Sequence, residues 1–246
     1  MSHRLAYRVV VPTVQVGELD VYYEVHGSGP PLLLIGGLGA DLTLFAPLTE
    51  RLAQRYQVIV FDNRGAGRSG KPDQPYSIPL MADDAIGLLD ALGIARAHLL
   101  GVSMGGRIAL EIAIGRPERV DRLVLVASSA AGRGRLTVSW PMRLLGMAKR
   151  LGLVRREHAQ PDYAFRRQLA ASVGYSALDR LGGVRAPTLI LHGRQDRSMP
   201  LDAALATRAG IAGARLELFD GGHLFFLLAQ RAAVLDRVER FLSEAR

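Results

Sequence analysis

The sequence predicts an α/β fold in which a mostly parallel sheet of about eight strands carries helices on both faces. Short, continuous apolar runs at residues 58–61, 98–102 and 123–126 are typical of parallel strands that are buried on both sides. Stretches with helical spacing lie between these runs, as the alternation of an α/β sheet requires. The chain has 246 residues, of which 49% are hydrophobic, so it can close one large core.

The remaining elements follow from similar patterns along the chain. Residues 14–26 alternate between apolar and polar side chains, which predicts an antiparallel edge hairpin that feeds the sheet. Two later apolar runs, at residues 187–193 and 215–219, predict further strands. Helices are predicted at residues 41–54, 79–92, 104–116, 201–209 and 224–245.

The pentapeptide Gly101-Val102-Ser103-Met104-Gly105 lies where a predicted strand turns into a predicted helix. A serine at such a turn is held in a strained backbone conformation, with its hydroxyl raised above the edge of the sheet. The N-terminus of the following helix favours negative charge beside it. The pattern therefore predicts that Ser103 is a nucleophile.

A serine nucleophile needs a base and an acid that orients the base. Asp196 lies in the loop after the strand at residues 187–193, and His223 follows the strand at residues 215–219. If the sheet is parallel, both residues lie at the same edge as Ser103, in the chain order serine, acid, histidine. We therefore predict a catalytic triad of Ser103, Asp196 and His223.

Other residues fit these roles less well. His192 is nearer to Asp196 along the chain, but it lies within a strand, which favours a structural role. An acid after the strand at residues 123–126 would be an alternative, but Ala127-Ser128-Ser129 carries no carboxylate.

The chain as a whole, apart from about residues 129–185, resembles serine hydrolases of the α/β-hydrolase superfamily. The resemblance rests on the pentapeptide, on Leu32–Gly39 as strand and oxyanion loop, on Asp62-Asn63-Arg64-Gly65-Ala66-Gly67-Arg68-Ser69 as an arginine turn, and on residues 186–200 as the unit that carries the acid. It implies an α/β-hydrolase fold with a core of residues 1–128 and 186–246. It also implies a small helical cap, residues 129–185, inserted after the sixth strand.

By the same resemblance, the backbone N–H groups of Leu38 and Met104 form the oxyanion hole. The chain departs from the usual pattern at one point, because Gly36-Gly37 stands where relatives have His-Gly. A bracing hydrogen bond from that histidine is therefore absent. Phe45 stands where many relatives place a tryptophan near the pocket, although an ordinary core role fits it equally well.

Two glycine-containing segments are candidates for nucleotide-binding loops. Neither Asn63-Arg64-Gly65 nor Gly36–Gly39 has the spacing of a phosphate-binding or dinucleotide-binding loop, so a structural role is favoured for both.

The net charge of +8 is concentrated in one part of the chain. Residues 129–185 contain eleven basic residues against three acidic ones, so the whole excess lies in the predicted cap. Three interpretations remain open: a solvated exterior, attraction of carboxylate-bearing substrates, and contact with an anionic lipid surface. Within the cap, residues 140–154 have the spacing of a helix that could cover an apolar acyl pocket. Candidate pocket residues are Phe45, Trp140, Met142, Leu145 and Leu224.

These observations predict hydrolysis of a carboxylic ester through an acyl-enzyme intermediate. By resemblance, Tyr76-Ser77-Ile78 and Met81-Ala82-Asp83-Asp84 place the chain nearest to esterases and 3-oxoadipate enol-lactonases. A serine nucleophile argues against haloalkane dehalogenase and epoxide hydrolase chemistry, whose members use aspartate. Hydrolysis of an enol-lactone or of a carbon–carbon bond remains an alternative. A small-ligand receptor that keeps the triad is an alternative of another class.

Composition also suggests what the protein lacks. There is no cysteine, so disulfides and thiolate metal sites are excluded, and the six scattered histidines predict no metal. No cofactor and no nucleic-acid partner are expected, because no binding motif accompanies the basic residues. We see no signal peptide and no long apolar run, so a cytoplasmic protein acting on a small ester or lactone is expected.

Overall fold

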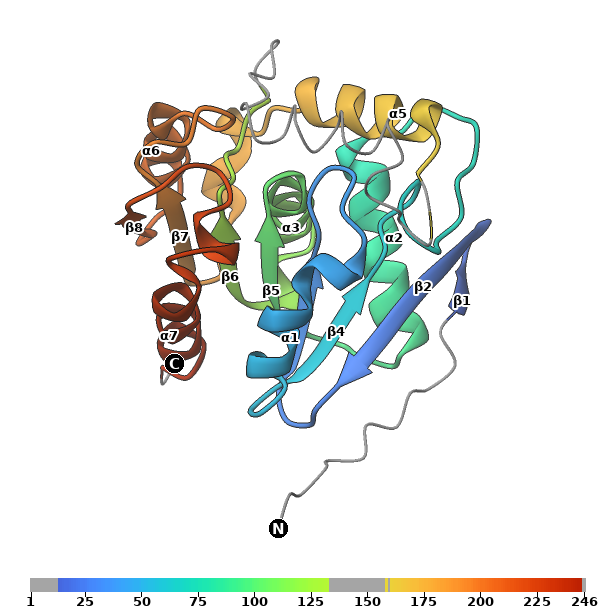
Figure 1. Ribbon diagram of the computed structural model, residues 1–246, viewed down its shortest axis with the longest axis horizontal. Coiled ribbons are helices and arrows are strands. Elements are labelled where there is room, and N and C mark those ends of the chain that lie inside the picture. The colour runs from blue at the N-terminus through green and yellow to red at the C-terminus, as the bar shows by residue number, and fades with distance from the viewer. Residues whose placement is uncertain (1–12, 133–157, 159, 245–246) are drawn as a thin grey trace.

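The computed structural model of the protein describes residues 13–132, 158 and 160–244. Eight strands form one sheet in the order β1-β2-β4-β3-β5-β6-β7-β8 (Figure 1). The strands are β1 (Thr13–Val16), β2 (Leu19–His26), β3 (Pro31–Ile35), β4 (Gln57–Phe61), β5 (Ala97–Val102), β6 (Val120–Val126), β7 (Thr188–Gly193) and β8 (Arg215–Phe219).

The sheet is parallel except at one edge. Strands β1 and β2 form an antiparallel hairpin, and β2 pairs antiparallel with β4. The six strands from β3 to β8 all run parallel to their neighbours. The predicted edge hairpin and mostly parallel sheet are therefore confirmed. Because the parallel strands share one direction, the loops after β3, β5, β7 and β8 emerge at the same edge.

Alternate side chains of each central strand enter two different cores. In β3, Leu33 and Ile35 pack into a core with α2 and α3, whereas Leu32 and Leu34 pack into a core with α1 and α7. Strand β5 follows the same alternation. Both faces of the central strands are therefore apolar, which explains why they read as continuous hydrophobic runs in the sequence.

The helices flank the strands along the chain. No helix in the described ranges is long and apolar enough to cross a membrane. The α-helices are α1 (Ala46–Leu52), α2 (Ile78–Ala91), α3 (Met104–Gly115), α5 (Asp162–Val173), α6 (Leu201–Gly210) and α7 (Arg231–Leu242). Shorter 3-10 turns are η1 (Leu42–Phe45), η2 (Pro117–Arg119), η3 (Leu178–Gly183) and η4 (Phe225–Leu227).

Two predicted helices are interrupted in the structure. The helix predicted at residues 41–54 divides into η1 and α1, and Pro47 lies in the first turn of α1, where its missing N–H is not needed. The helix predicted at residues 224–245 divides into η4 and α7. The break is at Leu228, whose backbone angles of φ −111° and ψ −125° lie outside the helical region.

The segment between β6 and β7 is described at residues 127–132, 158 and 160–187. Its two ends are joined through backbone hydrogen bonds from Gly132 to Tyr175 and from Ala177 to Ala130. Helix α5 lies at the top of Figure 1, above α2. The helix predicted at residues 140–154 lies outside the described residues. The division into a core and a cap at residues 129 and 185 stays a prediction.

Candidate active site

Ser103 forms a sharp turn between β5 and α3. Its backbone angles are φ 55° and ψ −116°, a strained conformation for a residue that is not glycine. The flanking glycines make the turn possible, because a Cβ atom on Gly105 would lie 2.1 Å from the carbonyl oxygen of Ile35. A Cβ atom on Gly101 would lie 2.4 Å from the carbonyl oxygen of Gly105. Both positions therefore require glycine.

The structure brings Ser103, His223 and Asp196 together at the carboxyl edge of the sheet. His223 Nε2 lies 2.9 Å from Ser103 Oγ, and His223 Nδ1 lies 2.7 Å from Asp196 Oδ2. With Nδ1 protonated and donating to the carboxylate, Nε2 carries the lone pair that faces the serine hydroxyl. The three side chains thus form one hydrogen-bonded series.

Asp196 is held in place by the backbone of its own loop. Its Oδ1 atom accepts hydrogen bonds from the N–H groups of Ser198, at 2.8 Å, and Met199, at 2.9 Å. The residue is only 5% exposed. One carboxylate oxygen therefore anchors the loop while the other faces His223.

His192 lies behind this site, fully buried within β7. Its Nε2 atom is 2.8 Å from the carbonyl oxygen of Met199, so Nε2 carries the proton and donates it to that carbonyl. The same nitrogen is 4.0 Å from Asp196 Oδ2. Burial lowers the pKa of His192 below its ordinary value, which favours the neutral ring. This geometry agrees with a structural role.

The loop after β3, which was predicted to supply the oxyanion hole, lies against Ser103. A Cβ atom on Gly37 would lie 3.3 Å from Ser103 Cβ and 3.9 Å from Ser103 Oγ. Leu38, the next residue, is partly exposed, whereas Met104 is the fully buried first residue of α3. The N–H groups in the first turn of an α-helix have no acceptor within the helix, so that of Met104 is available to an anion.

The loop after β3, the predicted oxyanion loop, is braced without a histidine at residue 36. Asn63 Nδ2 donates to the carbonyl oxygen of Gly36, at 2.9 Å. The N–H of Gly39 donates to Gln168 Oε1, at 3.0 Å, and the N–H of Leu42 donates to Asp62 Oδ1, at 2.7 Å. Three side chains from other segments therefore hold the backbone from residue 36 to residue 42.

Phe45 fills the space beside Gly36. Its Cε2 atom lies 2.9 Å from the position that a Cβ atom on Gly36 would occupy, and the residue is 1% exposed. Phe45 also packs in the same core as Leu48 and Leu100. The structure thus places it in the core, as one of the two sequence interpretations expected.

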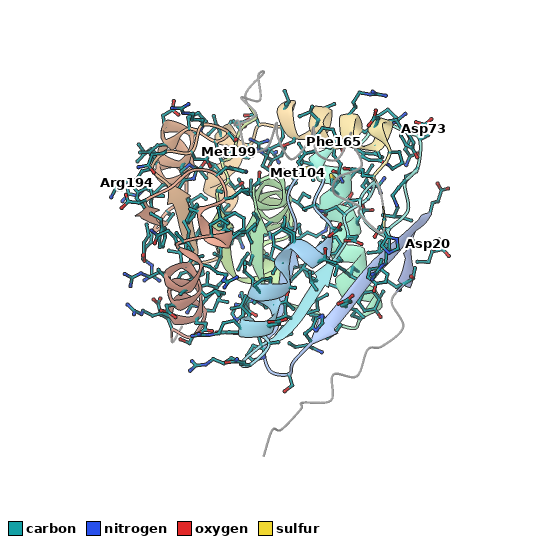
Figure 2. The ribbon with its side chains drawn as sticks, in the orientation of Figure 1. Asp20, Asp73, Met104, Phe165, Arg194 and Met199 are labelled. Carbon is teal, nitrogen blue, oxygen red and sulfur yellow. The ribbon has the colours of Figure 1, made fainter. Side chains whose placement is uncertain are left out.

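Of the other predicted pocket residues, only Leu224 lies within the described residues. Leu224 is partly buried next to His223 and packs on the core that contains α1 and α7. Trp140, Met142 and Leu145 lie outside the described residues. Phe165, on α5, is 40% exposed and reaches within 3.1 Å of a Cβ position on Gly39, so it forms an apolar surface beside the oxyanion loop. Figure 2 labels Phe165, Met104 and Met199 along the upper edge of the sheet.

The arginine turn supports the fold around the site. Arg64 is buried and donates through Nε and Nη2 to the carboxylate of Asp84, which is also buried. Burial raises the pKa of Asp84, and the hydrogen bonds from Arg64 oppose that rise. Because its guanidinium is engaged by a carboxylate, Arg64 has the structural role that was predicted in preference to phosphate binding.

Two buried polar residues near the site were missed by the sequence analysis. Gln168, on α5, is 0% exposed and contacts the oxyanion loop. Arg107, on α3, is 3% exposed and donates to Ser172 and to the carbonyl oxygens of Ser129 and Ala131.

Burial lowers the pKa of Arg107 to about 10, so the side chain is still charged at neutral pH.

Among the described residues, no group of three or more His, Cys, Asp or Glu side chains is arranged to hold a metal ion.

Comparison with known proteins agrees with this architecture. A sequence profile for the alpha/beta hydrolase fold matches residues 30–151. The chain is 32% identical over 244 residues to RutD of Azorhizobium caulinodans, provisionally named a carbamate hydrolase, with 87% of this chain and 92% of that protein covered. It is also 32% identical over 266 residues to the poly(3-hydroxyalkanoate) depolymerase of Ectopseudomonas oleovorans, with 95% and 93% covered.

Solved structures agree as well. The enol-lactonase from Burkholderia xenovorans LB400 superposes with a TM-score of 0.82 at 26% sequence identity, covering 95% of this chain and 100% of that chain. The eight-stranded sheet, the turn at Ser103 and these similarities lead to one conclusion. The chain is a hydrolase that belongs to the α/β-hydrolase family.

Proposed function

We propose that this protein is a serine hydrolase that cleaves a carboxylic ester through an acyl-enzyme intermediate. The observation that carries the proposal is the hydrogen-bonded series from Ser103 Oγ to His223 Nε2, at 2.9 Å, and from His223 Nδ1 to Asp196 Oδ2, at 2.7 Å. This is the arrangement in which a base takes the proton of a nucleophile and an acid orients the base.

In the first half of the reaction, Ser103 Oγ attacks the ester carbonyl carbon while His223 Nε2 accepts the hydroxyl proton. Asp196 holds the imidazole in the productive tautomer and stabilises the imidazolium that forms. The carbonyl oxygen becomes an oxyanion, which accepts hydrogen bonds from the backbone N–H groups of Leu38 and Met104. The tetrahedral intermediate then collapses, and the alcohol leaves with the proton that His223 returns.

In the second half, water replaces the alcohol. His223 takes a proton from the water as it attacks the acyl carbon, and the same oxyanion donors stabilise the second tetrahedral intermediate. Collapse releases the carboxylic acid and returns the proton to Ser103. The residues end in the state in which they began, so no cofactor is consumed.

The named relatives support a substrate with a carbonyl carbon bound to a heteroatom. A polyhydroxyalkanoate and an enol-lactone are both esters, and a carbamate has a related carbonyl group. A cyclic enol ester would be opened by the same two half-reactions, so lactone hydrolysis is the second candidate. The superposition with an enol-lactonase over 95% of this chain favours this candidate specifically.

We further propose that residues 129–185 act as a cap over this site, with residues 1–128 and 186–246 as the core. Helix α5 contributes Phe165, an exposed aromatic side chain beside the oxyanion loop, which suits an apolar acyl group. Most of the basic residues of the segment lie outside the described residues. Selection of anionic substrates and contact with a lipid surface therefore stay as predictions from the sequence.

The test is a panel of p-nitrophenyl esters and lactones of graded acyl length and charge, assayed with the wild type and Ser103→Ala. We expect multiple turnovers with the wild type and a loss of at least about 10³-fold with Ser103→Ala, since removing the nucleophile leaves only the oxyanion hole and binding. Equal turnover by both proteins would contradict the proposal. Single-turnover acylation without release would instead favour a receptor, and cleavage of a vinylogous diketone in preference to every ester would favour carbon–carbon bond hydrolysis.

A further inference from the structure

Gln168 is a fully buried polar side chain that joins helix α5 to two segments of the core. Its Oε1 atom accepts a hydrogen bond from the N–H of Gly39, at 3.0 Å, and its Nε2 atom donates to the carbonyl oxygen of Arg64, at 2.7 Å. Gly39 belongs to the oxyanion loop and Arg64 to the arginine turn. Gln168 therefore connects the inserted segment directly to the backbone beside Ser103.

The orientation of this amide is determined by its partners. A backbone N–H can only donate, so the atom that faces Gly39 must be the amide oxygen, and a backbone carbonyl can only accept, so the atom that faces Arg64 must be the amide nitrogen. The Nε2 atom of Gln160 also donates to Gln168 Oε1, at 3.0 Å. A buried side chain with these contacts has one orientation, because turning the amide would leave buried polar groups opposed.

The bond to Gly39 constrains the peptide groups on both sides of Leu38. The N–H of Ala40 donates to the carbonyl oxygen of Gly37, at 3.2 Å, which closes a turn with Leu38 and Gly39 at its centre. Gly39 has φ +66°, as the third residue of such a turn has when its central peptide is turned in the type II sense. The Gly37–Leu38 peptide, which carries the N–H of Leu38, is held by the bond to Ala40. The Leu38–Gly39 peptide is held by Gln168.

We propose that Gln168 is a positioning residue for the oxyanion loop, whose hydrogen bond with Gly39 sets the rate of the chemical step at Ser103. This inference rests on the proposed function, since it assigns a role to the N–H of Leu38 in stabilising the oxyanion. In this chain Gly36 lacks the side chain with which relatives brace the loop, and Gln168 supplies a brace from the inserted segment instead.

The same helix offers a matched control. Tyr163, also on α5, donates through its hydroxyl to the carbonyl oxygen of Lys71, at 2.7 Å, so it too docks the helix onto the core. Its acceptor lies outside the oxyanion loop. A variant at Tyr163 therefore weakens the docking of α5 without removing the hydrogen-bond acceptor of Gly39.

The experiment compares the wild type, Gln168→Met, Tyr163→Phe and Ser103→Ala with p-nitrophenyl butyrate. Methionine keeps the length of glutamine and removes all three hydrogen bonds of its amide. We expect kcat of Gln168→Met to fall about tenfold or more with KM within about twofold, since loosening one donor costs less than the roughly 10²-fold loss that follows its removal. A trifluoromethyl ketone forms an adduct with serine that carries an oxyanion. The affinity of Gln168→Met for this inhibitor should fall by the same factor as its kcat/KM. Tyr163→Phe should stay within about twofold of the wild type in kcat.

Unchanged kcat in Gln168→Met, or an equal loss in Tyr163→Phe, would overturn the inference. If Gln168→Met does not fold, Gln168→Ala, which leaves space for water, replaces it with the same expectation. Failure of the proposed function is seen separately, as turnover that persists in Ser103→Ala.

If turnover persists in Ser103→Ala, hydrogen exchange of the peptide that covers residues 36–42 still decides the role of Gln168. Faster exchange in the Gln168 variant than in Tyr163→Phe supports the brace, and equal exchange rules it out.

Discussion

The carboxylate of Asp196 binds its own loop through one oxygen and His223 through the other. Oδ1 accepts hydrogen bonds from the N–H groups of Ser198 and Met199, and Oδ2 lies 2.7 Å from His223 Nδ1. The two functions of this side chain are thus carried by different atoms. A substitution at one atom can therefore test catalysis while the loop stays in place.

Asp196→Asn is the variant that makes this separation. With its amide oxygen retained at the Oδ1 position, the loop keeps its two acceptor bonds, whereas the amide NH₂ now faces His223 Nδ1. Two donors then oppose each other, which favours the tautomer with the proton on Nε2 and removes the base that Ser103 needs. We expect kcat for p-nitrophenyl butyrate to fall by about 10³- to 10⁴-fold. A thermal midpoint close to that of the wild type is the control, and a kcat above one tenth of the wild-type value would contradict the assignment.

The contact between Gly36 and Phe45 explains why this chain has no side chain at residue 36. An added Cβ would lie 2.9 Å from Phe45 Cε2, within a closely packed core. Gly36→Ala is expected to destabilise the protein by about 1–3 kcal/mol, as overpacking does. In the double variant Gly36→Ala/Phe45→Leu, the smaller leucine leaves room for the added Cβ atom. The double variant should therefore lose less free energy of unfolding than the sum of the two single losses. Urea denaturation measures all four proteins, and simple additivity would show that the ring does not restrict residue 36.

Arg107 joins α3 to the described parts of the segment between β6 and β7. Its guanidinium donates to Ser172 O, at 2.7 Å, and to Ala131 O, at 2.9 Å. Arg107→Met leaves these buried carbonyl oxygens without their charged donor, so we expect a loss of about 2–4 kcal/mol in the free energy of unfolding. Arg116→Met, which removes an exposed ion pair with Asp83, is the matched control and should lose less than about 1 kcal/mol. Equal losses in the two variants would refute this role for Arg107.

His192 makes the stability of the protein depend on pH. Burial lowers its pKa in the folded state below the ordinary value of 6.5, so the unfolded chain binds a proton that the folded protein does not. Stability should therefore fall as the pH drops through 6.5 towards the folded-state pKa of this ring, and it should be fully regained above 6.5. His192→Gln should flatten this dependence by up to about 1 kcal/mol per pH unit when stability is measured by urea denaturation between about pH 5 and pH 8. If stability depends on pH equally steeply in His192→Gln and the wild type, the ring takes up its proton over the same pH range in the folded and unfolded states.

Much of the fold could be predicted because local patterns and packing agree. The strands at residues 58–61, 98–102 and 123–126 are apolar on both faces, and the structure packs alternate side chains of these strands into two cores. Ser103, Asp196 and His223 could be proposed together because each follows a strand, and parallel strands bring such loops to one edge.

The contacts of α5 could not be predicted, because they depend on residues far away in the sequence. Gln168 lies 129 residues from Gly39 and 104 residues from Arg64, and a glutamine among Arg166, Arg167 and alanines reads as a solvated position. Pro161 followed by Asp162 is a local signal that could have located the start of the helix. Nothing in the local pattern shows that the amide is buried.

Arg107 and the break at Leu228 were missed for similar reasons. A charged residue in a helix is usually exposed, and only the two ends of the inserted segment make burial of this guanidinium favourable. Leu228 follows a run of apolar residues that suits a helix, and nothing in that run marks its non-helical backbone.

The central claim is that Ser103 is activated by His223, and covalent labelling tests it most directly. The wild type, Ser103→Ala and His223→Ala are treated with an alkyl fluorophosphonate, and the adduct is followed by intact mass and located by peptide mapping. We expect one adduct on Ser103 in the wild type, none at that residue in Ser103→Ala, and labelling at least about 10²-fold slower in His223→Ala, since the base contributes on that scale. Labelling at the wild-type rate in His223→Ala, or an adduct on any other residue of the wild type, would contradict the account.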